Sequence, residues 1–258
     1  MRTLLAQIGE MARRSVTQTL RQPALIVPPI LFPLCLLAVN TGGLAAATKL
    51  PGFPTDSYLN FAIAIPFMQG ALFASINAGS SLARDVETGF LKRLALTPMQ
   101  RSALLLGNLA GVMTVAALSS LIYLAVGFAA GLEVKAGVGG VLVLIVLAFL
   151  VALAFASLGA LVGLRAGSGE AVQGLFPVFF VFLFLSSQAL PRPLIEQEWF
   201  RTIATWNPVS YLVEGIRSVV VLGWDGQALW RGFAIALVLC ALGIFGASRA
   251  LRTRLVRT

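Results

Sequence analysis

Stretches without charged side chains divide the chain into long apolar runs separated by shorter polar segments. A helix needs about 20 consecutive apolar residues to cross the hydrocarbon core of a membrane. Six runs reach that length once the last is extended backward past Arg231, the one charged residue that any of them contains. The pattern therefore predicts six membrane-spanning helices, over Ala24–Thr48, Ser57–Ala83, Ser102–Leu132, Ala136–Leu164, Ala171–Leu190 and residues 228–248.

The composition agrees with this pattern. Hydrophobic residues make up 58% of the 258 positions, charged residues make up 11%, and the mean hydropathy is +0.91. A soluble domain carries about 25% charged residues, so soluble enzymes, disordered proteins and secreted disulfide scaffolds are excluded. The chain has no histidine and two cysteines, which removes His-based catalysis and histidine zinc sites. We expect an all-α integral membrane protein with no catalytic residues and no metal site.

The distribution of Lys and Arg predicts the orientation of the spans. Six spans place both termini on one side of the membrane, and thirteen of the 19 basic residues lie in the segments on that side. Because cytoplasmic loops are enriched in Lys and Arg, we expect both termini to be cytoplasmic. The same bias explains the net charge of +9, so no nucleic-acid partner is inferred.

Residues 1–21 form a segment of a different kind. Apolar residues recur at helical spacing from Leu4 to Leu20, and charged residues occupy the other faces. The pattern predicts an N-terminal amphipathic interface helix that lies on membrane lipid at the inner surface. A simple basic anchor for the first span is an equally good interpretation.

The cytoplasmic loop between the second and third spans, residues 84–101, is rich in charge and contains a short apolar repeat. Apolar residues recur at intervals of three and four from Val86 to Leu94, which predicts a short helix that Pro98 ends. Such a helix, held in water between two spans, is suited to docking on a partner. The alternative is a basic loop without a partner. The candidate docking residues are Arg84, Asp85, Val86, Glu87, Gly89, Phe90, Leu91, Lys92 and Arg93.

Residues 191–227 are too polar to span a membrane and too apolar for a solvated loop. They predict two short helices, over 194–206 and 208–222, which dip into the outer leaflet as a re-entrant hairpin before the last span. Asn207 followed by Pro208 is typical of a helix start. Glu214 and Arg217 lie three residues apart, so we expect them to pair and to ease the cost of partial burial.

The absence of charge from the spans limits how transport would be powered. Ion-coupled transporters usually hold ionisable groups at membrane depth. The chain also lacks a phosphate-binding loop, since no Lys is followed by Ser or Thr. Energy for transport would therefore enter from a separate protein docked on residues 84–101. Uncharged polar residues could line a path or simply pack between helices, and they are Asn60, Gln69, Asn77, Gln173 and Gln188.

Two segments together resemble motifs of type-2 ABC exporter permeases. Residues 87–101 resemble the family's stretch that runs from a Glu through spaced leucines to a Ser-Pro or Thr-Pro pair. Residues 206–217 resemble its signature before the last span, in which Asn-Pro is followed at fixed spacing by Tyr or His, an acidic residue and Arg. The order of elements also matches over the whole chain. The nearest similarity is to daunorubicin-resistance-like drug exporter permeases.

This resemblance implies a working unit of two permease chains, as a homodimer, and two copies of a separate ABC ATPase subunit. ATP and Mg²⁺ would bind to the ATPase, and this chain would hold no cofactor. Residues 84–97 would contain a coupling helix that docks on the ATPase, and the outer hairpin would cap a path lined by the first, second and fifth spans. The candidate gate residues of the hairpin are Trp206, Asn207, Pro208, Tyr211, Glu214 and Arg217.

The predicted function is ATP-powered export of an amphiphilic small molecule, such as a drug, an antibiotic or a lipid-like compound, across a bacterial plasma (inner) membrane. A permease for a lipid-linked polysaccharide is the alternative within the family. An ATP-independent pore or scaffold, an intramembrane lipid transferase and a secondary transporter are the other classes. Asp85 and Glu87 are the one close carboxylate pair on the inner side, and they lack a metal-binding repeat, which disfavours the transferase.

Overall fold

The computed structural model describes residues 2–95 and 101–256, and every regular element in this part of the chain is helical. The helices are α1 (Arg2–Leu20), α2 (Pro23–Gly43), α3 (Tyr58–Ala62), α4 (Ala64–Glu87), α5 (Phe90–Ala95), α6 (Arg101–Ala129), α7 (Gly137–Ala166), α8 (Gly169–Gly174), α9 (Phe176–Phe184), α10 (Glu198–Trp206), α11 (Pro208–Arg217) and α12 (Gly226–Val256). Three shorter turns are η1 (Ala45–Lys49), η2 (Arg192–Leu194) and η3 (Ser218–Leu222).

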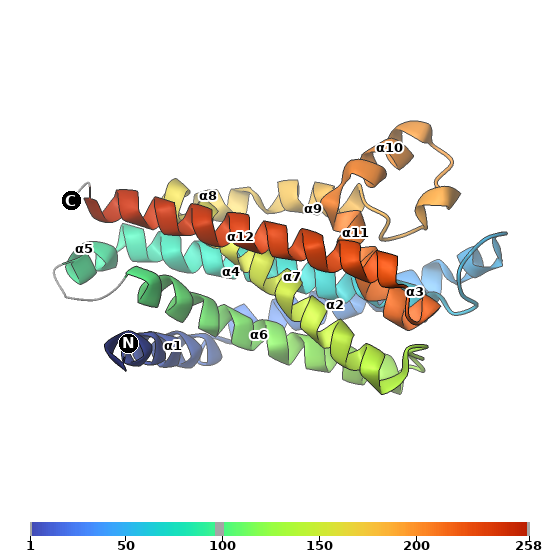
Figure 1. Cartoon of the computed structure of the whole chain (residues 1–258), viewed down its shortest axis with the longest axis horizontal. Helices are drawn as coiled ribbons and strands as arrows, with labels where there is room; N and C mark the ends of the chain where they lie inside the picture. The colour runs from blue at the N-terminus through green and yellow to red at the C-terminus, as the bar shows by residue number, and fades with distance from the viewer. Residues whose placement is uncertain (1, 96–100, 257–258) are drawn as a thin grey trace.

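The long helices form an elongated bundle (Figure 1). Both termini and α5 lie toward one end of it, which we call the α5 end. The helix α10 and the turn between α6 and α7 lie at the opposite end, which we call the α10 end. The two segments that carry the recognised motifs are therefore far apart in space.

Five helical segments among the described residues are long and apolar enough to cross a membrane: Pro23–Gly43, Tyr58–Glu87, Ala103–Ala129, Gly137–Ala166 and Gly226–Arg254. The prediction of an unbroken fifth span over residues 171–190 is not met, because this stretch is divided between α8 and α9, and α9 ends at Phe184. Pro177 explains the break, since it has no N–H group to donate to the carbonyl of Gln173. The broken pair still runs from the α5 end toward the α10 end (Figure 1).

The helices α4 and α7 approach so closely that glycine is required where they cross. A Cβ atom built on Gly159 would lie 1.9 Å from the carbonyl oxygen of Ser75. One built on Gly163 would lie 2.1 Å from the carbonyl oxygen of Gly79. Small residues four apart allow this approach in membrane helices, where close van der Waals packing holds the helices together. The two helices therefore form one packed unit.

The helix α1 confirms that the amphipathic pattern near the N-terminus is helical, and it packs along α6. A Cβ atom on Gly107 would lie 2.3 Å from Met11, and one on Gly111 would lie 2.2 Å from Ser15. The Ser15 hydroxyl also donates a hydrogen bond to the Asn108 carbonyl at 3.2 Å. One face of α1 thus rests on protein rather than on lipid.

Other helices compensate for two of the three prolines inside α2. In a regular helix the carbonyls of Leu25 and Pro29 would accept bonds from positions 29 and 33, but both of these are proline and have no N–H. The Asn77 amide donates to the Leu25 carbonyl at 3.4 Å, and the Tyr123 hydroxyl donates to the Pro29 carbonyl. Because unpaired carbonyls are costly in hydrocarbon, these contacts allow α2 to remain helical.

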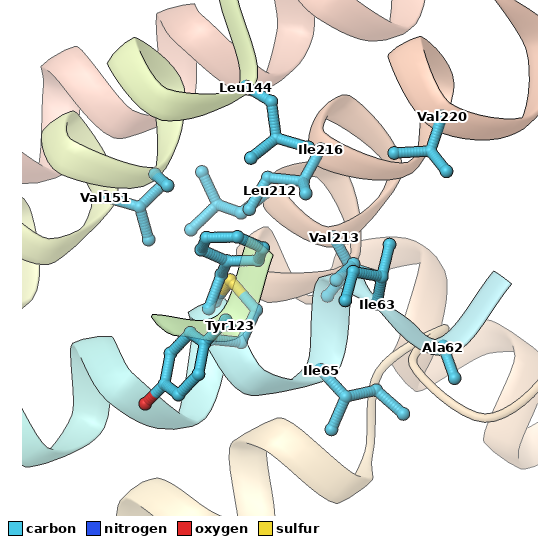
Figure 2. Close-up of a cluster of buried hydrophobic side chains, with 14 of the residues drawn as sticks. Ala62, Ile63, Ile65, Tyr123, Leu144, Val151, Leu212, Val213, Ile216 and Val220 are labelled. Carbon is cyan, nitrogen blue, oxygen red and sulfur yellow. The ribbon is translucent and has the colours of Figure 1, made fainter. Parts of the chain in front are cut away.

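A cluster of fully buried apolar side chains joins α11 to the helices around it. Figure 2 shows Leu212 and Ile216 of α11 beside Leu144 of α7, with Val213 toward Ile63 at the start of α4. All five side chains have no measurable exposure to solvent. This packing fixes α11 in the bundle, so the polar side chains of residues 206–217 are held in defined positions.

Candidate functional site

Asn207 lies between α10 and α11 and connects both to the end of α9. Its side-chain oxygen accepts a hydrogen bond from the Val209 N–H at 2.9 Å, which confirms the predicted helix start. Its amide nitrogen donates to the carbonyls of Phe182 at 2.6 Å and Leu185 at 2.9 Å. These carbonyls lie at the C-terminus of α9, where helix carbonyls lack partners. Asn207 therefore provides hydrogen-bond partners both to the N-terminus of α11 and to the C-terminus of α9.

Arg217 is buried, and its guanidinium binds backbone carbonyls from two other segments. It donates to the carbonyls of Phe61 at 3.0 Å, Ser187 at 3.0 Å and Gln188 at 2.8 Å. The guanidinium carbon also lies 3.4 Å from the centroid of the Phe61 ring. Burial lowers the pKa of Arg217 to about 9 and the Glu214 carboxylate opposes the shift, so the group stays protonated at neutral pH.

Glu214 does not pair with Arg217, and that prediction is wrong. Its carboxylate forms a bidentate pair with Arg192, with one of the two bonds at 2.8 Å, and it accepts a further bond from the Ser187 hydroxyl at 2.9 Å. This is the one ion pair within 4 Å that the described part of the chain contains. The planar guanidinium of Arg192 matches both carboxylate oxygens, whereas Arg217 points toward carbonyls.

Tyr211 connects this network to α10. Its hydroxyl donates to the Thr205 carbonyl at 2.9 Å, and the Arg192 guanidinium lies 4.5 Å from its ring centroid. Trp206, in contrast, is 83% exposed. The structure thus brings three of the predicted gate residues, Tyr211, Glu214 and Arg217, into one network that we call the clamp. Its other members are Phe61, Ser187 and Arg192. Asn207 bonds instead to Val209 and to the end of α9.

Sequence reasoning missed three members of the clamp. Arg192 carried a signal, because it is a charged residue next to a long apolar run. Phe61 and Ser187 carried none, since each contributes a carbonyl and a side chain of an ordinary type, and their partners in the clamp lie at least 27 positions away along the chain. Their roles depend on the fold alone.

The predicted docking segment begins differently in the structure. The helix α4 continues through Glu87, so Arg84 to Glu87 form its last turn rather than a loop. Gly89 has a φ of +67°, a conformation that favours glycine, and turns the chain into α5. Residues 96–100 of the predicted 84–101 segment, including Pro98, lie outside the described residues.

Contacts within the chain hold α5 in place. Leu91 is 5% exposed and belongs to a buried cluster with α4 and α6, so within this chain it is a core residue. Its docking contact stays a prediction. The Arg14 guanidinium of α1 lies 4.1 Å from the centroid of the Phe90 ring. The Glu87 carboxylate accepts a bond from the Gly169 N–H at 3.1 Å. Among the docking candidates whose side chains the structure describes, which leaves out Lys92, the exposed ones are Arg84, Glu87 and Arg93.

The five polar residues considered for a path occupy separate places. The Asn60 side chain accepts a bond from the Glu133 N–H at 3.1 Å, and Asn77 supports α2 as described above. Of the others, Gln69 and Gln188 are buried and Gln173 is exposed on α8. Asn60 and Asn77 therefore make hydrogen bonds between segments of the chain, which is the packing role given above as the alternative to lining a path. Within the described residues no group of three or more Cys, Asp and Glu side chains is arranged to hold a metal.

Known proteins that are similar in sequence identify the family of this chain. The model of the ABC-2 type transporter family matches residues 6–221. A putative transport permease ycf38 from Porphyra purpurea is 28% identical over 98% of this chain and 91% of its own length. The daunorubicin resistance ABC transporter permease protein DrrB1 from Streptomyces coeruleorubidus is 29% identical over 91% and 80%. The probable doxorubicin resistance permease DrrC of Mycobacterium tuberculosis is 24% identical over 84% and 77%. The chain therefore belongs to the ABC-2 type transporter family.

Proposed function

We propose that this chain is the permease subunit of an ATP-driven exporter that moves an amphiphilic small molecule out of a bacterial cytoplasm. The names of two relatives refer to daunorubicin and doxorubicin resistance, which supports a drug-like amphiphile as cargo. ATP and Mg²⁺ would bind to a separate ABC ATPase. Two copies of that ATPase and a second copy of this chain would complete the transporter.

One observation carries this proposal: a single helical stretch connects the clamp to the α5 end. Phe61, which contacts Arg217, lies in α3, and the chain continues directly through α4 to Glu87 beside α5. The two ends are opposite one another in Figure 1. Because α4 is packed closely on α7, a force applied at α5 would move the pair as a rigid unit and reach the clamp.

The orientation in the membrane follows from the charge bias. The α5 end, which carries most of the basic residues, would face the cytoplasm, and the α10 end would face outward. The helices α8 and α9 would together complete a sixth crossing, since they run from one end toward the other (Figure 1). Residues 191–227 would then form the outer re-entrant hairpin, shielded by protein.

Charge reversal at Glu87 tests the docking role of the α5 end. In proteoliposomes that contain the cognate ATPase, Glu87→Lys should lower substrate-stimulated ATP hydrolysis by about tenfold, the loss expected for a broken charged contact at an interface. Membrane insertion should be unaffected.

Two controls separate docking from local folding. Glu87→Gln keeps an acceptor for the Gly169 N–H and should retain the local structure. Glu10→Lys reverses an exposed charge on α1, which also lies toward the α5 end. This variant should leave hydrolysis near the wild-type level. Undiminished stimulated hydrolysis in Glu87→Lys would count against the docking assignment.

A further inference from the structure

A cavity of about 540 Å³ lies at the α10 end, next to the clamp. Its volume lies in the range of small-molecule sites, roughly 300–1,000 Å³. Its apolar walls come from the loop before α3, from α3 itself, from the region of η2, from η3 and from the start of α12. The apolar lining residues are Pro54, Phe61, Pro191, Pro193, Val221, Leu222 and Ala228.

The charges around this cavity favour an anion. Three arginines line it, and two carboxylates face them. Both carboxylates are occupied: Glu214 pairs with Arg192, and the Asp225 side chain accepts bonds from the Gln227 and Ala228 N–H groups at 3.0 Å and 3.2 Å. Arg201 on α10 is exposed and has no ion pair within the described part of the chain. Its guanidinium is therefore free to bind a negatively charged group.

The tryptophans show where this cavity lies relative to a membrane. The chain has four, and all of them fall within residues 199–230 at the α10 end. Their side chains are exposed by 60% to 83%. Exposed tryptophans are typical of the headgroup level of a membrane, where the ring meets both lipid and water. The cavity therefore opens at the level where lipid headgroups lie.

We propose that this cavity binds an anionic phospholipid, with the phosphate at Arg201 and the adjoining glycerol and acyl segment along the apolar wall. A free phosphate would use the charge but leave the apolar wall uncovered, and a zwitterionic lipid would place a second cation near three arginines. The site is separate from the docking segment at the α5 end. It requires neither the ATPase nor transport.

Tryptophan fluorescence offers a direct test, because all four tryptophans fall within residues 199–230, the segment that also supplies most of the residues lining the cavity. The full chain in nonionic detergent is titrated with brominated phosphatidylglycerol, and brominated phosphatidylcholine is titrated in parallel. We expect saturable quenching by phosphatidylglycerol at a lower concentration than by phosphatidylcholine. Arg201→Gln should weaken apparent phosphatidylglycerol binding by roughly threefold to tenfold, as expected for one exposed charged contact.

Two further variants keep the test independent of folding defects. Arg231→Gln removes an exposed arginine near the same end that does not line the cavity, and it should bind as the wild type does. Ala228→Phe fills the cavity without a change of charge and should also weaken binding. Equal quenching by the two lipids, with no effect of Arg201→Gln, would overturn the proposal. Displacement of the lipid by glycerol 3-phosphate at similar concentrations would also overturn it, by showing a site for small anions.

Discussion

Arg217 is the residue on which the α10 end depends most. Its guanidinium bonds to carbonyls at the end of α3 and in the loop after α9, which are 156 and about 30 positions away along the chain. These carbonyls belong to residues buried inside the protein, so they need hydrogen-bond donors from the chain itself, and the Arg217 side chain supplies several at once.

Removal of this side chain tests its structural role. Arg217→Met should lower the apparent unfolding temperature in detergent, because each buried carbonyl left without a donor costs about 1–3 kcal/mol. Arg217→Lys should recover part of the loss, since an ammonium keeps the charge but lacks the planar fork. Arg231→Met, at an exposed position, serves as the control. Unfolding of Arg217→Met at the wild-type temperature would contradict this account of the clamp.

The sequence identified Arg217, Glu214 and Asn207 as important but paired two of them incorrectly. Spacing along a helix predicts which residues are neighbours on its surface, and it placed Glu214 next to Arg217. The true partner, Arg192, lies 22 positions away, and contacts at that distance depend on how the loop after α9 folds back. The helix start at Asn207 was predictable because it depends on local sequence alone.

Among the helices, the crossing of α4 and α7 sets the geometry of the bundle. Small residues four apart were visible in the sequence, but they occur in many membrane helices, and the pattern did not show which helix would lie against them. The break in the fifth apolar run had a local signal in Pro177, which predicts a kink. Hydropathy gave no such signal, because it measures how apolar a stretch is and not whether its helix is continuous.

A side chain at this crossing should separate the two helices. Gly159→Val would place its Cβ atom on the Ser75 carbonyl, so α4 and α7 must move apart, at a cost of about 1–3 kcal/mol. Thermal unfolding in detergent should show lower stability, and transport should fall because the unit that transmits force is loosened. Gly42→Ala has open space around the added carbon and should behave as the wild type. Equal stability of the two variants would argue against a close crossing.

At the scale of the molecule, the two ends have different chemistry and should face opposite sides of the membrane. After replacement of Cys35 and Cys240 by alanine, Thr205→Cys and Thr253→Cys place single thiols toward the α10 end and the α5 end. A membrane-impermeant maleimide added to intact cells should label the first thiol, and it should label the second only after permeabilisation. The reverse pattern would invert the orientation inferred from the basic residues.

For the whole molecule, we propose that this chain transmits force and does not generate it. The most direct measurement is accumulation of daunorubicin in inside-out proteoliposomes, with the chain alone and with the cognate ATPase. We predict uphill accumulation only when the ATPase and Mg-ATP are both present. Uphill accumulation by the chain alone, without nucleotide, would contradict the central claim.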